Sequence, residues 1–274
     1  MKEEALVFGC DRDSLVGVLA VPDSPASRGV LIVVGGPQYR AGSHRQFTLL
    51  ARELAATGIA SLRFDHRGMG DSSGEARTFE SVNEDIGCAI DRLIEAAPAV
   101  NEVVIWGLCD AACAALFYAH GDFRVRGVVL VNPWVRTEHG IAQTHLRHYY
   151  GARLLDSGFW KKLLRAEIDL KRSVTTLAKF VADAARPKRE AGSLPDRMEH
   201  ALRRFSGRVL LILSGKDLTA DEFRGVVGRS QRWKALLADA RVTQHELPEA
   251  NHTFSRREWR DQVARWTAEW VKQG

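Results

Sequence analysis

A cysteine stands where the chain is predicted to turn sharply from a strand into a helix. Cys109 lies in Gly107-Leu108-Cys109-Asp110-Ala111, between the apolar run Val103–Trp106 and the alanine-rich helical stretch Cys109–Tyr118. The small residues two positions before and after it permit the turn, because larger side chains would collide with the neighbouring strand and helix. A helix N-terminus also favours the negatively charged thiolate, which is the nucleophilic form of cysteine. We predict that Cys109 is a catalytic nucleophile; the competing interpretation is a buried structural cysteine.

A thiol nucleophile needs a base, and the base needs an acid that orients it. His252 lies in a loop between the last predicted strand, Val242–Leu247, and the last predicted helix, near Glu258–Lys272. Enzymes with a nucleophile on such a turn carry the three residues in the chain order nucleophile, acid, histidine. Among the nine histidines, only His252 combines that order with a loop at the same sheet edge. We predict that His252 is the base; a solvated loop histidine is the alternative.

The orienting acid is expected in the tight turn that follows a strand between the nucleophile and the base. Asp217 lies in such a turn, directly after the predicted strand Val209–Leu213. Asp221, four residues further on, is the competing candidate for this role. Asp217 could instead serve only as the N-cap of the helix that follows it. We predict that Asp217 holds the imidazole of His252.

Acyl transfer also needs backbone N–H groups that stabilise the negative oxygen of the tetrahedral intermediate. One donor is expected from Asp110, the residue after the nucleophile. The second is expected from the loop after the apolar run Val30–Val34, where Gly36 is the first choice and Gln38 the second. Pro37 has no N–H and cannot donate. An ordinary tight turn is the alternative interpretation of this glycine-rich loop.

Three further residues are candidates for substrate contact. Trp134 follows a predicted strand and could line an acyl pocket, although such aromatic residues are as often part of a core. His44 and Arg45 lie near the oxyanion loop and could contact an anionic substrate, or could simply be exposed. The sequence contains no metal-ligand spacing and no nucleotide-binding glycine loop in the required context, so we expect neither a metal nor a cofactor.

Strands and helices alternate along most of the chain, which predicts a mostly parallel, helix-covered sheet with right-handed crossovers. The eight predicted strands are Ala5–Phe8, Leu15–Val21, Val30–Val34, Ile59–Phe64, Val103–Trp106, Gly127–Val131, Val209–Leu213 and Val242–Leu247. The predicted helices between and after them are Phe47–Ala56, Val82–Ala97, Cys109–Tyr118, Trp233–Ala238 and Glu258–Lys272. The first two strands are separated only by a turn, so we expect them to form an antiparallel pair at one edge of the sheet.

The alternation breaks after Trp134. Residues 135–205 contain no convincing apolar strand and hold three amphipathic helical stretches, around His145–Leu155, Phe159–Leu164 and Val174–Ala185. A helical insertion of this kind suggests a lid over a site. We therefore predict a first part of the α/β core at 1–134, a helical lid insertion at 135–205 and a second part of the core at 206–274.

Composition limits the partners that the chain could have. The formal net charge is +5, but no dense run of Lys and Arg is interleaved with aromatic residues, so we expect no nucleic-acid partner. The four cysteines fit neither a zinc pattern nor a disulfide framework, and Cys113 is expected to pack in the core. We find no signal region and no apolar run long enough for a membrane span. We expect a cytoplasmic protein whose thiols stay reduced, and the sequence leaves its oligomeric state open.

Two motifs resemble those of a known family. Asp65-His66-Arg67-Gly68-Met69-Gly70-Asp71-Ser72 resembles the Asp-x-Arg-Gly-x-Gly-x-Ser motif that follows the fourth strand in α/β-hydrolases of the serine-aminopeptidase and lipase-like type. Val34-Gly35-Gly36-Pro37 is similar to their His-Gly-Gly-Pro oxyanion loop, with Val34 in place of histidine. The resemblance covers nearly the whole chain except the insertion, and it implies an α/β-hydrolase fold.

A narrower resemblance is to the exosortase A system-associated hydrolases, which are encoded beside bacterial exopolysaccharide and protein-sorting loci. The segments that carry it are Val33–Arg40, Gly42–Gln46 and Gly107–Asp110. It implies a link to envelope or exopolysaccharide production and gives no substrate. The cysteine at the sharp turn also resembles that of dienelactone hydrolases and of bile-acid-CoA amino-acid acyltransferases.

These residues leave three functions open. The first is hydrolysis of a small ester or thioester through a covalent acyl-cysteine, because a thiolate attacks activated acyl carbons well. The second is transfer of the same acyl group to an amine or alcohol. The third is a non-catalytic binding role, against which the complete Cys–Asp–His set in the expected order argues.

Overall fold

The computed structural model describes residues 1–36, 38–135 and 192–273. Its eight-stranded sheet has the order β1-β2-β4-β3-β5-β6-β7-β8. The strands are β1 (Lys2–Cys10), β2 (Asp13–Val21), β3 (Arg28–Val33), β4 (Ser61–Asp65), β5 (Glu102–Leu108), β6 (Val125–Val131), β7 (Arg208–Ser214) and β8 (Val242–Leu247). β2 pairs antiparallel with β1 and with β4, and every other pair is parallel. The predicted eight-stranded, mostly parallel sheet is confirmed.

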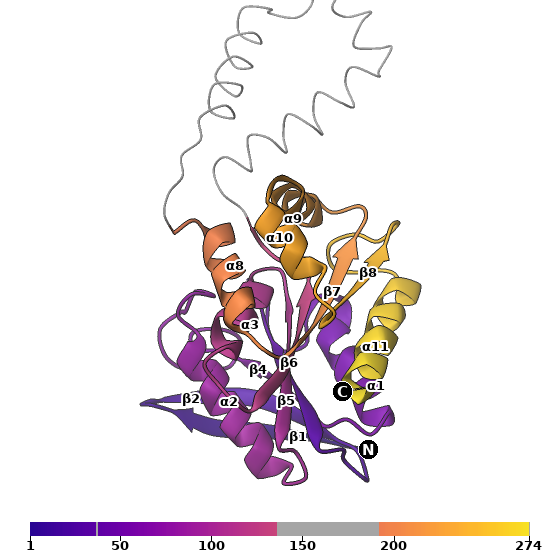
Figure 1. Ribbon diagram of the computed structural model, residues 1–274. Coiled ribbons are helices and arrows are strands. Elements are labelled where there is room, and N and C mark those ends of the chain that lie inside the picture. The colour runs from indigo at the N-terminus through magenta and orange to yellow at the C-terminus, as the bar shows by residue number, and fades with distance from the viewer. Residues whose placement is uncertain (37, 136–191, 274) are drawn as a thin grey trace, which may run out of the picture.

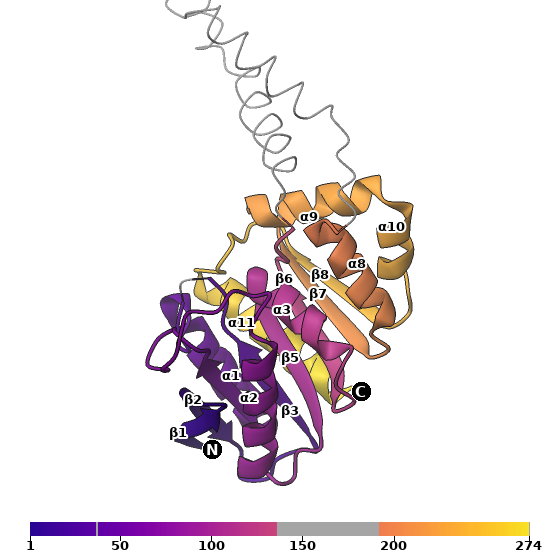
Figure 2. The ribbon, with the colours of Figure 1, turned by 90° about the vertical axis from the view of Figure 1, so that its left-hand side faces the viewer.

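Helices cover both faces of the sheet. Those that the structure describes are α1 (Gln46–Ala56), α2 (Asn83–Ala96), α3 (Asp110–Ala119), α8 (Leu194–Arg204), α9 (Leu218–Arg229), α10 (Gln231–Leu237) and α11 (Arg257–Lys272). α1 and α11 lie on one face, and α2, α3 and α8 lie on the other (Figure 1). α8, α9 and α10 lie together beside β7 and β8 (Figure 2).

The central strands are apolar throughout because both of their faces are covered. In β3, Leu31 and Val33 pack in the hydrophobic cluster that includes α2 and α3. Val30 and Ile32 point the other way and pack in the cluster that includes α1 and α11. Successive side chains of a strand alternate between faces, so one continuous apolar run supplies both cores.

The pairing register brings three loops that carry predicted site residues to one edge of the sheet, the upper edge in Figure 1. Val33, at the end of β3, pairs with Gly107 in β5. Leu108, at the end of β5, pairs with Val131 at the end of β6. The oxyanion loop, the turn at Cys109 and the loop after β6 therefore leave the sheet side by side.

The predicted insertion falls mostly outside the described residues. Its three predicted helical stretches lie within 136–191, and the division of the chain at residues 135 and 205 stays a prediction. Its last part, α8, packs against α3 and places Met198 and Leu202 in the hydrophobic core. The sequence analysis also missed α9, which begins directly after Asp217.

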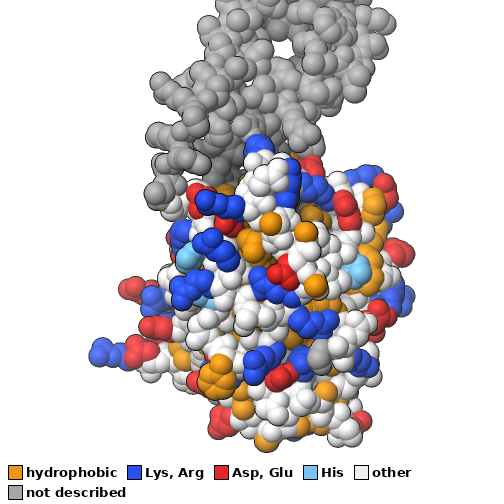
Figure 3. Space-filling model, in the orientation of Figure 1, with side chains coloured by type: hydrophobic (Ala, Val, Ile, Leu, Met, Phe, Trp, Pro, Cys, Tyr) orange, Lys and Arg blue, Asp and Glu red, His pale blue; other side chains and the backbone are white. Residues whose placement is uncertain are grey.

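On the face shown in Figure 3, Lys and Arg side chains are interspersed with acidic and apolar ones. The net positive charge is therefore not gathered into one patch on that face. No described helix has the length and apolar character that a crossing of a membrane would need.

Candidate active site

The backbone at Cys109 forms a sharp bend between β5 and α3. Cys109 has φ 63° and ψ −122°, a conformation that an L-residue holds only when its surroundings enforce it. Its N–H donates to the carbonyl of Val131, at 2.9 Å. Its own carbonyl accepts hydrogen bonds from the N–H groups of Ala112 and Trp134, at 3.1 and 3.2 Å. These three hydrogen bonds hold the strained residue at the carboxyl edge of the sheet.

Gly107 makes the bend possible. A Cβ atom built on Gly107 would lie 2.4 Å from the carbonyl oxygen of Ala111, well inside any permitted contact. Because the obstacle is backbone, it cannot move aside without displacing α3. The first turn of α3 is therefore the reason why position 107 needs a small residue.

Asp217 contacts the imidazole of His252. Asp217 Oδ2 lies 2.8 Å from His252 Nδ1, and the carboxylate side chain is 6% exposed. The same carboxylate accepts hydrogen bonds from the N–H groups of Thr219 and Ala220, at 3.1 and 3.3 Å, as the N-cap of α9. The orienting and capping roles, which the sequence analysis weighed as alternatives, coexist in one residue. The other candidate, Asp221, instead pairs with Arg224 at 2.8 Å.

His252 also contacts Cys109. The thiol of Cys109 is the second side chain, after Asp217, whose hydrogen bonding and charge act on the imidazole pKa. Burial lowers the pKa of His252, but the hydrogen bonds and negative charges of Asp217 and Cys109 outweigh burial and raise that pKa to about 10. Asp217 thus holds the imidazole of His252, and the surroundings of that imidazole favour its protonated form.

A buried polar network that the sequence analysis did not predict holds the loop of His252. Asn132, which follows β6, donates from Nδ2 to the carbonyl of His252 at 3.1 Å and to Ser214 Oγ at 2.8 Å. The backbone N–H of Ser214, at the end of β7, donates to Asn132 Oδ1 at 2.8 Å. Ser214 Oγ also donates to the carbonyl of Asn251 at 3.0 Å. In the sequence, the only indication of this network is that Asn132 and Ser214 each follow an apolar run.

The predicted oxyanion donor Gly36 has an unexpected partner. The N–H of Gly36 donates to Asp110 Oδ2 at 3.0 Å, while the N–H of Ala111 donates to Asp110 Oδ1 at 3.0 Å. A Cβ atom on Gly35 would lie 2.2 Å from that carboxylate, so the loop needs glycine there. The backbone N–H of Asp110 stands at the first position of α3, where a helix offers no partner of its own. The alternative donor, Gln38, accepts the N–H of Ser43 on its side chain at 3.2 Å.

An ionic network fixes the oxyanion loop against the loop after β4. The backbone N–H of Arg40 donates to Asp65 Oδ1 at 2.6 Å, and its guanidinium pairs with both Asp65 and Asp71. The backbone N–H of Asp71 donates to Asp65 Oδ2 at 3.1 Å. Arg67, on the same loop, is buried and pairs with Asp85 of α2 at 2.6 Å. The Asp-x-Arg-Gly-x-Gly-x-Ser motif therefore holds the backbone of these loops in place.

The remaining predicted residues lie around the site without a described substrate role. Trp134 is half-buried, and its carbonyl accepts the thiol of Cys113 at 2.9 Å. Cys113 is fully buried, and burial raises the pKa of its thiol well above the ordinary value. His44 and Arg45 are exposed on a short 3₁₀ turn, Ser43–Arg45. Their contacts with substrate stay predictions.

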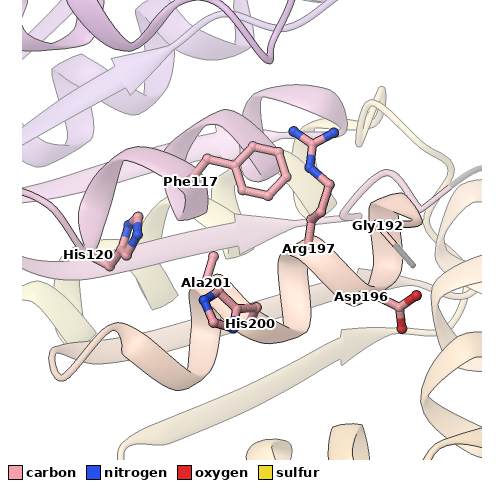
Figure 4. Close-up of a pocket in the computed structure, with 7 residues that line it drawn as sticks. All are labelled: Phe117, His120, Gly192, Asp196, Arg197, His200 and Ala201. Atoms are coloured by element: carbon pink, nitrogen blue, oxygen red, sulfur yellow. The ribbon is translucent and has the colours of Figure 1, made fainter. Parts of the chain in front are cut away.

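A hollow lies between α3 and α8 (Figure 4). It has a volume of about 400 Å³, and its lining includes none of the three residues joined above. The guanidinium of Arg197 stacks over the ring of Phe117, 4.9 Å from its centre, and pairs with Glu80. Asp196 accepts a hydrogen bond from Ser193 Oγ at 2.5 Å. The charged groups of this hollow are thus already partnered.

The described residues contain no group of three or more His, Cys, Asp or Glu side chains that could hold a metal ion. The candidate site brings together a thiol, an imidazole, a carboxylate and backbone N–H groups. This set suits nucleophilic attack on an acyl carbon with proton transfer through the imidazole.

The fold has many solved relatives of low sequence identity. The esterase Pf2001 from Pyrococcus furiosus has a TM-score of 0.67 at 15% identity, and the alignment covers 99% of this chain and 92% of that one. A dienelactone hydrolase from Anabaena variabilis has a TM-score of 0.63 at 17% identity, with 99% and 97% covered. A proline iminopeptidase from Mycobacterium smegmatis has a TM-score of 0.61 at 13% identity, with 98% of each chain covered. A search among curated proteins found no matching sequence.

The sequence profile of one family matches residues 25–252, a span that includes the oxyanion loop, the bend at Cys109 and His252. That family is described as serine aminopeptidase, S33. The profile covers most of the chain. The chain belongs to the serine aminopeptidase S33 family of α/β-hydrolases.

Proposed function

We propose that the protein hydrolyses activated acyl compounds, esters or thioesters, through a covalent acyl group on Cys109. The observation that carries the proposal is the hydrogen bond between Asp217 and His252, with the thiol of Cys109 acting on the same imidazole. The likeness in fold to an esterase and to a dienelactone hydrolase agrees with a small acyl substrate.

In the first step the thiolate of Cys109 attacks the acyl carbon. The new S–C bond forms as the carbonyl electron pair moves onto oxygen, and the N–H groups of Gly36 and Asp110 stabilise the resulting oxyanion. For this, the carboxylate of Asp110 must first release the N–H of Gly36. The carbonyl then re-forms, the bond to the leaving group breaks, and His252 gives its proton to the departing alkoxide or thiolate.

In the second step water releases the acyl group. Once Cys109 is acylated it carries no negative charge, so one of the causes that raise the pKa of His252 is gone. The neutral imidazole can then take a proton from water as the water oxygen attacks the thioester carbon. The C–S bond breaks, a carboxylic acid leaves, and the thiolate and the imidazolium are restored.

The cysteine sets the substrate class. A thiolate is itself a good leaving group, so a tetrahedral intermediate formed from an amide would tend to expel sulfur again and return to substrate. Esters with good leaving groups and thioesters do not have this disadvantage. We therefore propose acyl esters and thioesters rather than the peptide amides that the family description names.

The narrower resemblance to exosortase A system-associated hydrolases extends this proposal to a role in bacterial exopolysaccharide production. The motifs that support it are Val33–Arg40 and Gly107–Asp110.

Intact-mass spectrometry after mixing with 4-nitrophenyl acetate and with acyl thioesters tests the mechanism. We expect one acetyl group per chain, mapped to Cys109 by peptide analysis, and no adduct on Cys109→Ala. Cys88→Ala is the matched control, because Cys88 is another partly exposed cysteine outside the site, and it should acylate like the wild type. Turnover by Cys109→Ala at the wild-type rate would contradict the proposal. Faster loss of the adduct with added amines or alcohols than with water alone would instead assign the protein as an acyltransferase.

A further inference from the structure

A cavity lies against the predicted oxyanion donors, on the side of the loop after β4. It has a volume of about 260 Å³, and Gly36, Asp110 and Ala111 form part of its wall. His66, Arg77 and Thr78 contribute polar side chains to the same wall, and the remaining side chains that line it are apolar. Sites that enclose a whole small molecule usually measure about 300–1,000 Å³, so this cavity suits one part of a substrate.

The backbone on both sides of Arg77 is held in place. Ala76 packs so closely on Gly68 that a Cβ atom there would lie 2.3 Å from the Cα of Ala76. On the other side, the N–H of Thr78 donates to Ser81 Oγ at 3.1 Å, and the N–H of Ser81 donates to the carbonyl of Thr78 at 2.9 Å. Arg77 is therefore directed to the cavity wall by a fixed loop.

Arg77 carries an unused hydrogen-bond donor. Its Nε atom is buried and has no hydrogen-bond partner among the residues that the structure describes. A buried guanidinium nitrogen without a partner is costly, because water can no longer satisfy it. Arg77 lowers the pKa of Glu84, but Arg67 pairs with Glu84 and lowers that pKa more.

The other polar groups of the cavity leave room for an anion. The carboxylate of Asp110 already accepts two backbone N–H groups, which disperse its negative charge. His66 Nδ1 lies 3.3 Å from the carbonyl of Arg67, so this nitrogen already has a backbone partner. Of these groups, the guanidinium of Arg77 is the one that matches a negatively charged ligand.

We propose that Arg77 binds an anionic group on the acyl chain of the substrate, most simply a carboxylate. This inference rests on the proposed function, because an acyl carbonyl held by Gly36 and Asp110 has its chain at the mouth of this cavity. The substrate is then a thioester or ester of a short dicarboxylic acid or of a similar acid with a negative charge. The guanidinium donates to the carboxylate and makes no bond with the reacting carbon.

Three thioesters of N-acetylcysteamine test the assignment: glutaryl, its neutral monomethyl ester, and pentanoyl, each corrected for spontaneous hydrolysis. We expect wild-type kcat/KM for the glutaryl thioester to exceed that for the methyl glutaryl thioester about tenfold, as a charge-assisted hydrogen bond allows. Arg77→Met should remove this preference, and an unchanged circular-dichroism spectrum and urea-unfolding midpoint show that the variant is folded. Arg77→Lys should keep part of the preference.

Arg92→Met is the matched control. Arg92 also has a buried Nε without a partner, but it lies on α2, pairs with Glu95 and is not part of the cavity wall. Its substitution should leave the glutaryl preference intact. Equal turnover of all three thioesters by the wild type, or an unchanged preference in Arg77→Met, would overturn the assignment while the proposed function stands. Failure of the wild type to hydrolyse any of the three would count against the proposed function itself.

Discussion

The carboxylate of Asp110 accepts the backbone N–H of Gly36, with 3.0 Å between Gly36 N and Asp110 Oδ2. An acyl oxyanion would need that same N–H, so the side chain and the reaction intermediate compete for one donor. In the proposed mechanism, Asp110 thus offers its own N–H to the intermediate while its carboxylate occupies the second donor, the N–H of Gly36.

This competition predicts the effect of Asp110→Asn. The amide oxygen of asparagine binds the N–H of Gly36 less strongly than a carboxylate, by about 1 kcal/mol, so the donor is released more easily. We expect kcat/KM for a neutral activated ester to rise about fivefold, a ratio that corresponds to this energy. Asp196→Asn, which changes an acid in the first turn of α8 away from the site, should have no effect. A fall in kcat/KM would mean that the carboxylate serves to hold the loop in its active position.

The pKa of His252 should depend on both of its partners. Hydrogen bonds and charges from Asp217 and then Cys109 raise that pKa to about 10 against the lowering effect of burial. We expect Asp217→Asn to lower the pKa of His252 more than Cys109→Ala does, as read from the imidazole carbon-bound proton in NMR titrations. His245, whose pKa burial lowers, lies on β8 and should titrate alike in all three proteins. A pKa of His252 near 6.5 in the wild type would contradict the ion pair.

The same shift makes the stability of the fold depend on pH. The pKa of His252 is raised from 6.5 to about 10 in the folded chain, so folding favours the protonated ring. This stabilisation is complete below pH 6.5 and is lost as the pH rises toward 10. We expect the loss of stability in His252→Gln, relative to the wild type in urea unfolding, to be largest near pH 6 and to shrink by pH 10. A difference that grows with pH would have the wrong sign.

The sequence predicted the sheet well because its central strands are unbroken apolar runs. It missed α9, whose sequence contains Gly225 and Gly228 and lacks a continuous apolar face. The sequence analysis also missed the exposed first residues of β1. Lys2, Glu3 and Glu4 form a strand because they pair with β2, and not because their side chains are buried.

The arrangement of Cys109, Asp217 and His252 followed from chain order and from strand ends, and the structure brings the three together. The long-range contacts that hold the site in place could not be predicted from the sequence. Gly36 and Asp110 are 74 residues apart, and the side chains of Asn132 and Ser214 meet across 82 residues. Neither pair leaves a local pattern, because each contact is set by the register of the sheet.

Gly107 provides a direct test of the bend at Cys109. In Gly107→Ala the new methyl group would lie 2.4 Å from the carbonyl oxygen of Ala111, so β5 and α3 must separate. We expect a loss of about 3 kcal/mol in the free energy of unfolding, typical of an overpacked core, and loss of acylation at Cys109. Gly228→Ala is the matched control, because a Cβ atom there meets nothing within 4 Å and lies in a helix. That control should gain about 0.5–1 kcal/mol and keep full activity. Equal stability of the two variants in urea unfolding would show that the bend tolerates a side chain and that its strain is not enforced by α3.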